Sequence, residues 1–297
     1  MQIRQVSFKA MGCPCELKFF HENDDQAQIV ADLCIEEARR FEQKYSRYLA
    51  SSVTSQINAA AGDKPIETDA ETAALLDYAD ACFRESRGLF DITSGVLRQV
   101  WRHDRQSLPE PQELVYWLGK LGWEKVERTA HTVFLPEKGM ELDLGGLVKE
   151  YAADALAAIL GNQGVEHGLV SLGGDIATSG SMPGGEPWGI GISDPRSPGQ
   201  AIAMVDLHQG AIATSGGYER FIEIDGKRYS HLLNPQTGFP ADCLLSVTAV
   251  APGAVVAGAI CSIALLMEQQ EGLDFLAESG VRYLAVDTSG NCHGTVS

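Results

Sequence analysis

One histidine stands beside a rigid turn, where it would be held in place to move a proton. The segment SHLLNPQTGFP, residues 230–240, sets His231 between a strand-like stretch and a turn built from Asn-Pro and Thr-Gly. Proline fixes its own backbone and restricts the residue before it, so little freedom is left at this turn. An imidazole titrates near neutral pH and can serve as a general base. The residues alone leave a structural and a catalytic role open, and they favour the structural role somewhat.

Three segments place glycines next to polar groups where a strand meets a turn or a helix. They read DLGGLVK at 143–149, SLGGD at 171–175 and TSGGY at 214–218. Glycine lets backbone N–H groups approach an anion closely, and a helix N-terminus adds a favourable dipole. Lys149, one turn into its helix, would then reach a phosphate or a ring oxygen. Such glycines also occur in plain turns, and none of the three segments matches the dinucleotide-binding fingerprint or the P-loop.

A glycine also lies inside an apolar helical segment, AVVAGAICSIALLM at 254–267. Gly258 and Ser262 are four residues apart, so they share a face of this helix. A glycine in a helix interior costs about 1 kcal/mol relative to alanine, which indicates that a neighbour needs the space. The pattern favours close packing of another backbone as the explanation.

The elements that must position these residues alternate between helices and short strands. Periodicity and end signals predict helices over 24–49, 69–87, 110–120, 144–164, 254–267 and 271–279. Strands are expected within 3–20, in a hairpin-like stretch at 130–143, and over 168–174, 187–193, 201–207, 211–216, 219–224, 227–233, 244–251 and 282–287. Their short connections favour antiparallel pairing, because parallel pairing needs long crossovers. The sequence therefore predicts an α+β fold with mixed, mainly antiparallel sheets and flanking helices.

Length and composition limit the class of protein. The chain has 297 residues, 44% of them hydrophobic, which fits a single domain over 1–297 or two intimately packed lobes. Forty acidic residues against 23 basic ones give a net charge of -17, which disfavours binding to nucleic acid or anionic lipid. The N-terminal region has no apolar run typical of a signal peptide or anchor. We therefore expect no membrane segment and a cytoplasmic protein, or a periplasmic one if a leader was removed.

The cysteines indicate packing rather than metal or redox chemistry. There are seven, an odd number without zinc-finger spacing, and most stand among apolar residues. Cys13 and Cys15 flank Pro14 on a predicted strand and would share a face. We expect them to be reduced core residues.

Taken together, these segments resemble the FAD:protein FMN transferase family, often called ApbE-like. Seven motifs follow one another over nearly the whole chain: AMG (10–12), YSRY (45–48), FDITSG (90–95), DLGGLVKEYAAD (143–154), VSLGGD (170–175), ATSGGYERF (213–221) and HLLNPQTGFP (231–240). The resemblance implies an ApbE-like fold and an enzyme that cuts the FAD pyrophosphate. It further implies that FMN is transferred through its phosphate to a Ser or Thr hydroxyl of a target flavoprotein, with release of AMP and help from magnesium.

The resemblance also assigns roles to the matched positions. It makes His231 the general base that accepts the hydroxyl proton. The residues that would contact FAD are Met11, Tyr48, Asp143, Lys149 and the backbone at Leu232. The magnesium ligands would be the carbonyl group of Gly146 and the side chain of Ser262.

Five motif positions depart from the family pattern. The family binds its metal through an Asp and a Thr one turn apart, and these positions read Gly258 and Ser262 here. Gly217 and Asn234 stand where the family has acids, and Glu150 stands where it has a glycine. The missing carboxylate is a preferred ligand type for magnesium. Two alternatives to the transferase therefore stay open: an FAD-binding or flavin-delivery protein without transferase activity, and an FAD pyrophosphatase that yields FMN and AMP.

Overall fold

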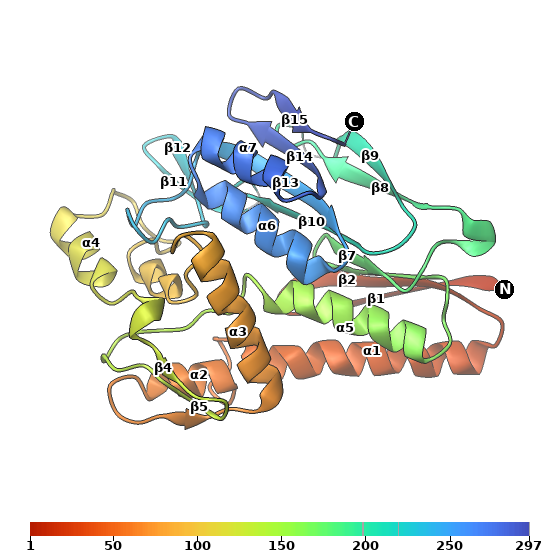
Figure 1. The fold of residues 1–297 in the computed structure, drawn as a ribbon, viewed down its shortest axis with the longest axis horizontal. Helices are drawn as coiled ribbons and strands as arrows, with labels where there is room; N and C mark the ends of the chain where they lie inside the picture. The colour runs from red at the N-terminus through yellow and green to blue at the C-terminus, as the bar shows by residue number, and fades with distance from the viewer. Residues whose placement is uncertain (198, 219, 297) are drawn as a thin grey trace.

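The computed structural model describes residues 1–197, 199–218 and 220–296, and its centre is an eight-stranded sheet (Figure 1). The strand order is β1-β2-β6-β7-β10-β13-β14-β15, so neighbouring strands follow one another along the chain, and all these pairings are antiparallel. The bounds are Gln2–Ala10 (β1), Cys13–His21 (β2), Gly168–Leu172 (β6), Asp175–Thr178 (β7), Ala211–Gly216 (β10), Leu244–Ala251 (β13), Arg282–Asp287 (β14) and Cys292–Gly294 (β15). The predicted α+β class with mainly antiparallel sheets is confirmed.

Helices cover one face of this sheet (Figure 1). Helix α5 packs on β6 and β7, α6 packs on β10 and β13, and α1 lies against α5. A further helix, α7, follows α6 and contacts β14. The bounds are Asp24–Tyr45 (α1), Val148–Asn162 (α5), Ala254–Leu266 (α6) and Gln269–Glu278 (α7).

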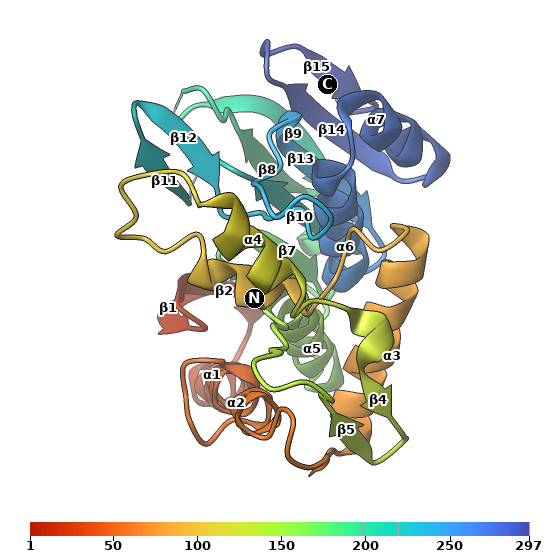
Figure 2. The ribbon, with the colours of Figure 1, turned by 90° about the vertical axis from the view of Figure 1, so that its left-hand side faces the viewer.

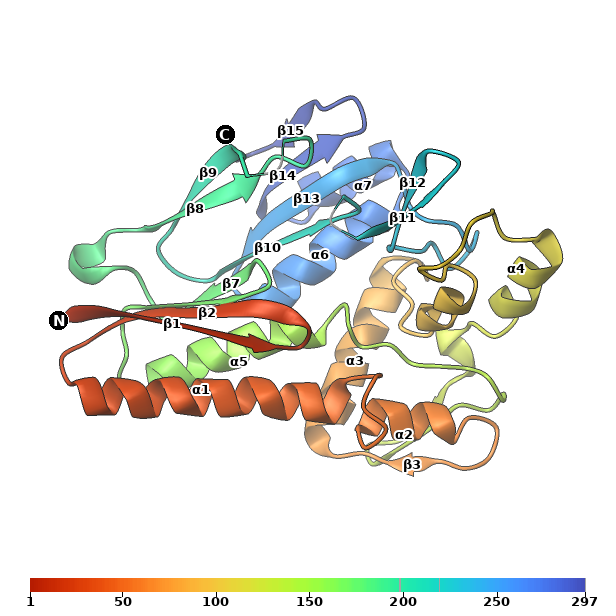
Figure 3. The same cartoon turned by 180° about the vertical axis from the view of Figure 1, so that it is seen from behind.

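A two-stranded ribbon covers the opposite face of the sheet (Figure 3). It consists of β8 (Trp188–Ser193) and β9 (Ala201–Leu207), which pair antiparallel. Leu169, Ile212 and Leu284 of the large sheet are buried against this ribbon. Their chain neighbours point to the helices instead, because successive side chains in a strand face opposite sides.

The remaining elements gather at one end of the molecule (Figure 2). The small sheet β3-β5-β4 lies beside α2 and α3, and the ribbon β11-β12 packs near α4 through a shared apolar cluster. The bounds are Val53–Ala59 (α2), Ile66–Glu67 (β3), Ala70–Glu85 (α3), Pro111–Leu118 (α4), Glu127–Arg128 (β4), Thr132–Phe134 (β5), Phe221–Ile224 (β11) and Lys227–Ser230 (β12). Short 3₁₀ helices occupy Ser94–Gln99 and Trp123–Lys125, and a third, Pro183–Gly185, lies elsewhere, just before β8.

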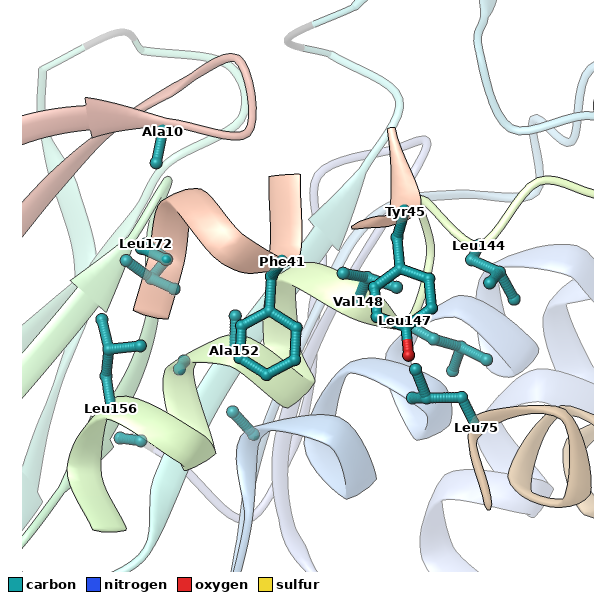
Figure 4. Close-up of a cluster of buried hydrophobic side chains, with 14 of the residues drawn as sticks. Ala10, Phe41, Tyr45, Leu75, Leu144, Leu147, Val148, Ala152, Leu156 and Leu172 are labelled. Atoms are coloured by element: carbon teal, nitrogen blue, oxygen red, sulfur yellow. The ribbon is translucent and has the colours of Figure 1, made fainter. Parts of the chain in front are cut away.

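The core joins the helical layer to the sheet (Figure 4). Phe41 and Tyr45 of α1 are buried in the same cluster as Val148 and Ala152 of α5. The ring of Phe41 also meets Tyr151 edge to face. This packing holds the first turns of α5, which carry several of the expected site residues, in a rigid setting.

Most predicted elements are present, with three corrections. The first helix ends at Tyr45 rather than near Leu49, and its C-cap Ser46 is extended with φ -67° and ψ 120°. The expected hairpin at 130–143 is wrong, because its strand Thr132–Phe134 pairs with β3 and β4 instead. The strand predicted to begin at Glu219 begins at Phe221 in the structure, and Glu219 itself lies outside the described residues. Helix α2 and strands β3, β4, β7 and β15 were not predicted.

Two further expectations concern the described residues. All seven cysteines are free, and Cys243 and Cys292 are the two that are not buried, as a largely core placement predicts. Within residues 1–197, 199–218 and 220–296, no helix has the length and apolarity needed to cross a bilayer.

Candidate functional site

Two tight turns lie against each other at one end of the sheet. The β1–β2 turn has Met11 and Gly12 at φ 52° and 71°, and the β6–β7 turn has Gly173 and Gly174 at φ 59° and 97°. Two successive positive φ values are typical of the type I′ turn of a two-residue hairpin, which favours glycine. The N–H of Gly173 donates to the Pro14 carbonyl at 2.9 Å. The β6–β7 turn is therefore fixed beside β2, with no room for a larger residue at its first position.

Asp175 follows this turn and forms a buried ion pair with Lys149. The distance from Lys149 Nζ to Asp175 Oδ2 is 2.5 Å, and Asp175 is only 1% exposed. The backbone N–H of Thr214 donates to Asp175 Oδ1 at 3.3 Å. Burial opposes the charge on Lys149, but the carboxylates of Asp175 and Glu150 outweigh burial and raise the pKa of Lys149. The ammonium group is therefore charged and held at this end of the sheet.

Glu150 is a second buried acid next to this pair. Its residue is 7% exposed, and Oε1 lies 3.9 Å from Lys149 Nζ. Its Oε2 is buried and has no hydrogen-bond partner among the described residues. Burial and then the charge of Asp175 raise the pKa of Glu150 well above its ordinary range. The site therefore holds two buried carboxyl groups and one lysine between them.

The space at Gly258 is used by this glutamate. A Cβ atom added to Gly258 would lie 2.7 Å from Cγ of Glu150 and 3.3 Å from its Oε1. The expectation that another backbone packs there is wrong, because the neighbour is a side chain from α5. Ser262, one turn further along α6, has its hydroxyl 3.3 Å from that of Ser215 on β10. Gly258 and Ser262 thus line one face of α6, toward α5 and β10.

Asp154 fixes α6 against α5. Helix α6 has Gly253 at its N-cap and therefore no side-chain cap of its own. Asp154 accepts hydrogen bonds from the N–H groups of Ala254 at 2.6 Å and Val255 at 3.0 Å. A carboxylate at this place satisfies free N–H groups and faces the positive end of the helix dipole.

Asp143 and Tyr48 are joined by an arginine between them. The Arg47 guanidinium pairs with Asp143, donates to the Tyr48 hydroxyl at 3.0 Å and lies 5.1 Å from the centre of the Tyr48 ring. Asp143 Oδ1 also accepts from the Gly145 N–H at 3.0 Å. Gly95 packs so closely that an added Cβ would lie 2.5 Å from Asp143 Cβ. Tyr48 itself is 79% exposed and offers a free ring face to a planar ligand.

His231 is exposed, and its ring is oriented by a backbone carbonyl. Its Nδ1 lies 3.1 Å from the Arg220 carbonyl oxygen, and its own N–H donates to the same oxygen at 3.1 Å. A carbonyl oxygen only accepts, so Nδ1 donates in this contact and the lone pair of the neutral ring is on Nε2. The N–H of Leu232 donates to the Ser230 hydroxyl at 3.0 Å. The geometry leaves Nε2 as the basic nitrogen.

The turn after His231 is rigid, as expected from its sequence. Asn234 Oδ1 accepts from the N–H groups of Gln236 at 2.8 Å and Thr237 at 3.2 Å. Trp101 Nε1 donates to the Gly238 carbonyl at 2.7 Å. The acceptor oxygen of Asn234 thus does what an aspartate oxygen would do in such a turn.

The structure brings the expected site residues into linked groups. A Cβ atom added to Gly173 would lie 2.9 Å from Cys13 Cβ and 3.6 Å from Lys149 Cδ. Lys149 therefore lies close to the β1–β2 turn. The thiol of Cys15 and then the charges of Lys149 and Arg220 lower the pKa of Cys13 against the effect of burial, so both cations act near this turn. A hollow of ≈ 320 Å³ opens beside Met11, lined by Lys9, Ala10, Gly12, Cys13, Pro14 and Glu42. A larger hollow, ≈ 460 Å³, lies between α1 and α5, away from these residues.

Three residues of the site were not singled out from the sequence. Arg47 lies between Ser46 and Tyr48 in the YSRY motif, Asp175 ends the SLGGD segment, and Glu150 was noted only as a departure. Their roles depend on partners far away along the chain. An acid next to Lys149 in a helix start and an acid next to paired glycines were the available signals.

The oxygen atoms on α5, on α6 and in the turn before α5 determine which kind of metal ion the protein could bind here. Within the described part of the chain, no three His, Cys, Asp or Glu side chains gather in a way that could bind a metal. The groups on hand are carboxylate, hydroxyl and carbonyl oxygens, including Ser262 on α6 and Gly146 in the turn before α5. Hard oxygen donors suit magnesium, which binds through few protein ligands and keeps its remaining positions for water and phosphate.

The sequence of this chain is similar to a known family. The sequence model of the ApbE family matches residues 11–285. The FAD:protein FMN transferase of Treponema pallidum (strain Nichols) is 33% identical over 246 residues, which are 76% of this chain and 68% of that protein. The FAD:protein FMN transferase of Klebsiella pneumoniae (strain 342) is 33% identical over 265 residues, covering 83% and 78%.

Solved structures agree with this similarity. The crystal structure of the ApbE protein from Thermotoga maritima has a TM-score of 0.91 and 30% identity, and the match covers 99% of this chain and 97% of that one. The flavin transferase ApbE from Vibrio cholerae has a TM-score of 0.88 at 23% identity, covering 100% and 97%. At that lower identity the second match supports the fold alone.

Proposed function

Because this chain belongs to the ApbE family, we propose that it is an FAD:protein FMN transferase that modifies a Ser or Thr hydroxyl of a target flavoprotein. The family match over residues 11–285 is the observation that carries this proposal. The product would be an FMN phosphoester on the target, with AMP released.

The reaction needs a base for the attacking hydroxyl. The acceptor oxygen forms a bond to the phosphorus of the FMN half, and the bond from that phosphorus to the bridging oxygen breaks. The bridging oxygen leaves with AMP, and the hydroxyl proton goes to His231. The Arg220 carbonyl supports this role, because Nδ1 donates to it and the lone pair of the neutral ring is therefore on Nε2.

Other residues would bind and orient FAD. Lys149 would place its charge beside the pyrophosphate from the first turn of α5, where the helix dipole also favours an anion. Tyr48 would offer its exposed ring, and Arg47 with Asp143 would hold that ring in place. Met11 and the backbone at Leu232 would complete the contacts from two separate turns. Local positive charge is required because the chain as a whole is strongly acidic.

Magnesium would neutralise charge on the pyrophosphate when bound. The residues present fit such an ion, since Glu150 has a buried oxygen, Oε2, without a hydrogen-bond partner among the described residues, and its carboxyl group lies near Gly258, one turn from Ser262 on α6. We assign Ser262 and the Gly146 carbonyl as ligands, in agreement with the matched motif positions. Ser262 would contribute through its hydroxyl, which Ser215 orients.

The first prediction concerns His231. We expect His231→Ala to lower the rate of FMN transfer by about 10²- to 10⁴-fold, the usual contribution of a general base, while FAD still binds. Transfer would be followed by the mass of the acceptor and FAD binding by flavin fluorescence. His208→Ala is the matched control, because Nδ1 of His208 also meets a backbone carbonyl, that of Gly185, at 3.1 Å on an exposed loop. Equal turnover in both variants would remove His231 from the mechanism.

A further inference from the structure

Glu150 is a buried acid to which the proposed function assigns neither a ligand nor a catalytic role. Its Oε2 has no hydrogen-bond partner among the residues that the structure describes, and the residue is 7% exposed. Leaving a carboxylate buried without compensation is strongly unfavourable. The nearby ammonium of Lys149 lies 2.5 Å from Asp175 and 3.9 Å from Glu150, so it serves two acids at once. When both acids are ionised, one negative charge is left over.

Gly258 provides the space that this side chain fills. A Cβ there would lie 2.7 Å from Glu150 Cγ, which any larger residue would have to displace. The carboxyl group of Glu150 therefore lies against the face of α6 that also carries Ser262. Glu150 of α5 thus meets α6 at Gly258, and Ser262 lies one helical turn further along the same face of α6.

A second contact fixes the register of the two helices. Asp154 of α5 caps the first turn of α6 at Ala254 and Val255. Positions 150 and 154 of α5 therefore face positions 258 and 254 of α6, one turn apart on each helix. The cap keeps Glu150 opposite Gly258, so its location does not depend on a flexible loop.

We propose that Glu150 is the carboxylate ligand of the divalent cation at this site, supplied from α5 across Gly258. Its oxygen, together with the Ser262 hydroxyl, gives the hard donors that magnesium prefers. Asp175 stays paired with Lys149 and adds negative charge nearby. A divalent cation bound there would pair with the Glu150 oxygen that has no hydrogen-bond partner among the described residues. This inference rests on the proposed function for the purpose of the cation, but cation binding can be measured without it.

Metal titration tests this proposal directly. Mn²⁺ binding would be followed by electron paramagnetic resonance and Mg²⁺ binding by calorimetry, each with and without FAD. Glu150→Gln keeps the shape of the side chain and removes its charge, and we expect the metal affinity to fall by about tenfold or more. Glu278→Gln, exposed at the end of α7, removes one charge elsewhere and should bind metal like the unaltered protein.

A carboxylate swap provides a second, independent variant. The double variant Glu150→Gly, Gly258→Asp moves the carboxylate from α5 to α6, and we expect it to recover most of the affinity lost in Glu150→Gln. Gly258→Asp alone would press against Glu150 and should destabilise the fold. Recovery in the double variant would separate loss of a ligand from general damage to the site.

The outcomes distinguish this inference from the proposed function. Unchanged Mn²⁺ affinity in Glu150→Gln, or no Mn²⁺ binding by the unaltered protein even with FAD, would overturn the inference and leave Lys149 as the cation that serves both acids. FMN transfer without Glu150-dependent metal binding would contradict this inference alone. Metal binding that depends on Glu150, without FMN transfer to any acceptor, would contradict the proposed function alone.

Discussion

Met11 holds a backbone conformation that glycine adopts more easily. Its φ is 52° in a two-residue turn, where a bulky side chain is an outlier. Strain of this kind is of order 1–3 kcal/mol and is found often at ligand sites. The Met11 side chain packs against the apolar core, and the hollow next to this turn is lined by Gly12 and Cys13, which follow Met11 in the chain. We interpret the strained methionine as part of the FAD site.

Replacing Met11 should affect the stability of the fold and the binding of FAD in different ways. We expect Met11→Gly to keep the free energy of unfolding or raise it by up to about 1 kcal/mol, because the strain is relieved. FAD binding should weaken several-fold, since the side-chain contact is lost. Urea unfolding and flavin fluorescence would measure the two effects. Arg87→Gly is the control, because Arg87 has the same φ of 52° directly after the C-cap of α3, and equal FAD affinity in both variants would make Met11 a turn residue only.

The sequence identified the residues whose chemistry shows in their type and neighbours. His231 and Lys149 stand next to a rigid turn and a helix start, and both features are present in the structure. The position of the Glu150 side chain could not be predicted, because it depends on the contact between α5 and α6 at Gly258. Arg47 was missed for the same reason, since its partner Asp143 is 96 residues away in the chain.

At the scale of elements, α1 is tied to α3 by charged side chains. Arg40 donates two hydrogen bonds to the Glu71 carboxylate, at 2.7 and 2.8 Å, and Lys44 lies 2.5 Å from the same group. Hydrogen bonding from Arg40 and then from Lys44 outweighs the effect of burial and lowers the pKa of Glu71 to about 2. This contact holds the helix that carries Tyr45 and leads to Tyr48.

The tie should make stability depend on pH in a defined direction. A carboxyl group whose pKa is lower in the folded than in the unfolded state stabilises the fold at pH values above its unfolded pKa. This stabilisation is lost as the pH falls toward the pKa of the folded state. Glu71→Gln should therefore lower the free energy of unfolding by about 1–2 kcal/mol at neutral pH. The difference in the free energy of unfolding between this variant and the unaltered protein should shrink as the pH falls from the ordinary pKa of 4.5 to about 2. Urea unfolding at several pH values measures this, and a difference that stays constant would indicate packing rather than charge.

Element boundaries show what local sequence can and cannot specify. Asp69 was predicted to cap α3, and its side chain accepts from the Thr72 N–H as expected. The end of α1 was placed too late, because Tyr48 fits the helical spacing but Arg47 is drawn into the contact with Asp143. The prediction of a hairpin at 130–143 was wrong because β5 pairs with β3 and β4. Strand β3 is distant in the chain, and both partner strands are too short to show a sequence pattern.

For the whole molecule, the antiparallel pairing of the strands was predicted from the short connections, whereas the order and the layering of the strands were not. The alternation that sends Leu169 to one face and Val170 to the other appears in the sequence only as a continuous apolar run. The chain is strongly acidic, and FAD carries negative charge, so the local cations Lys149, Arg47 and Arg220 must overcome the overall field. A single domain over residues 1–297 and the absence of nucleic-acid binding stay predictions.

The central claim is that this chain transfers FMN to a protein. The most direct measurement is the intact mass of an acceptor flavoprotein domain after incubation with this protein, FAD and magnesium, with AMP quantified in the same sample. We predict a mass gain equal to one FMN phosphoester and an equal amount of AMP, both lost when the acceptor Ser or Thr is replaced by alanine. AMP without a mass gain would show hydrolysis of FAD instead. Neither product across several acceptors, with FAD bound, would contradict the transferase and favour a flavin-binding protein.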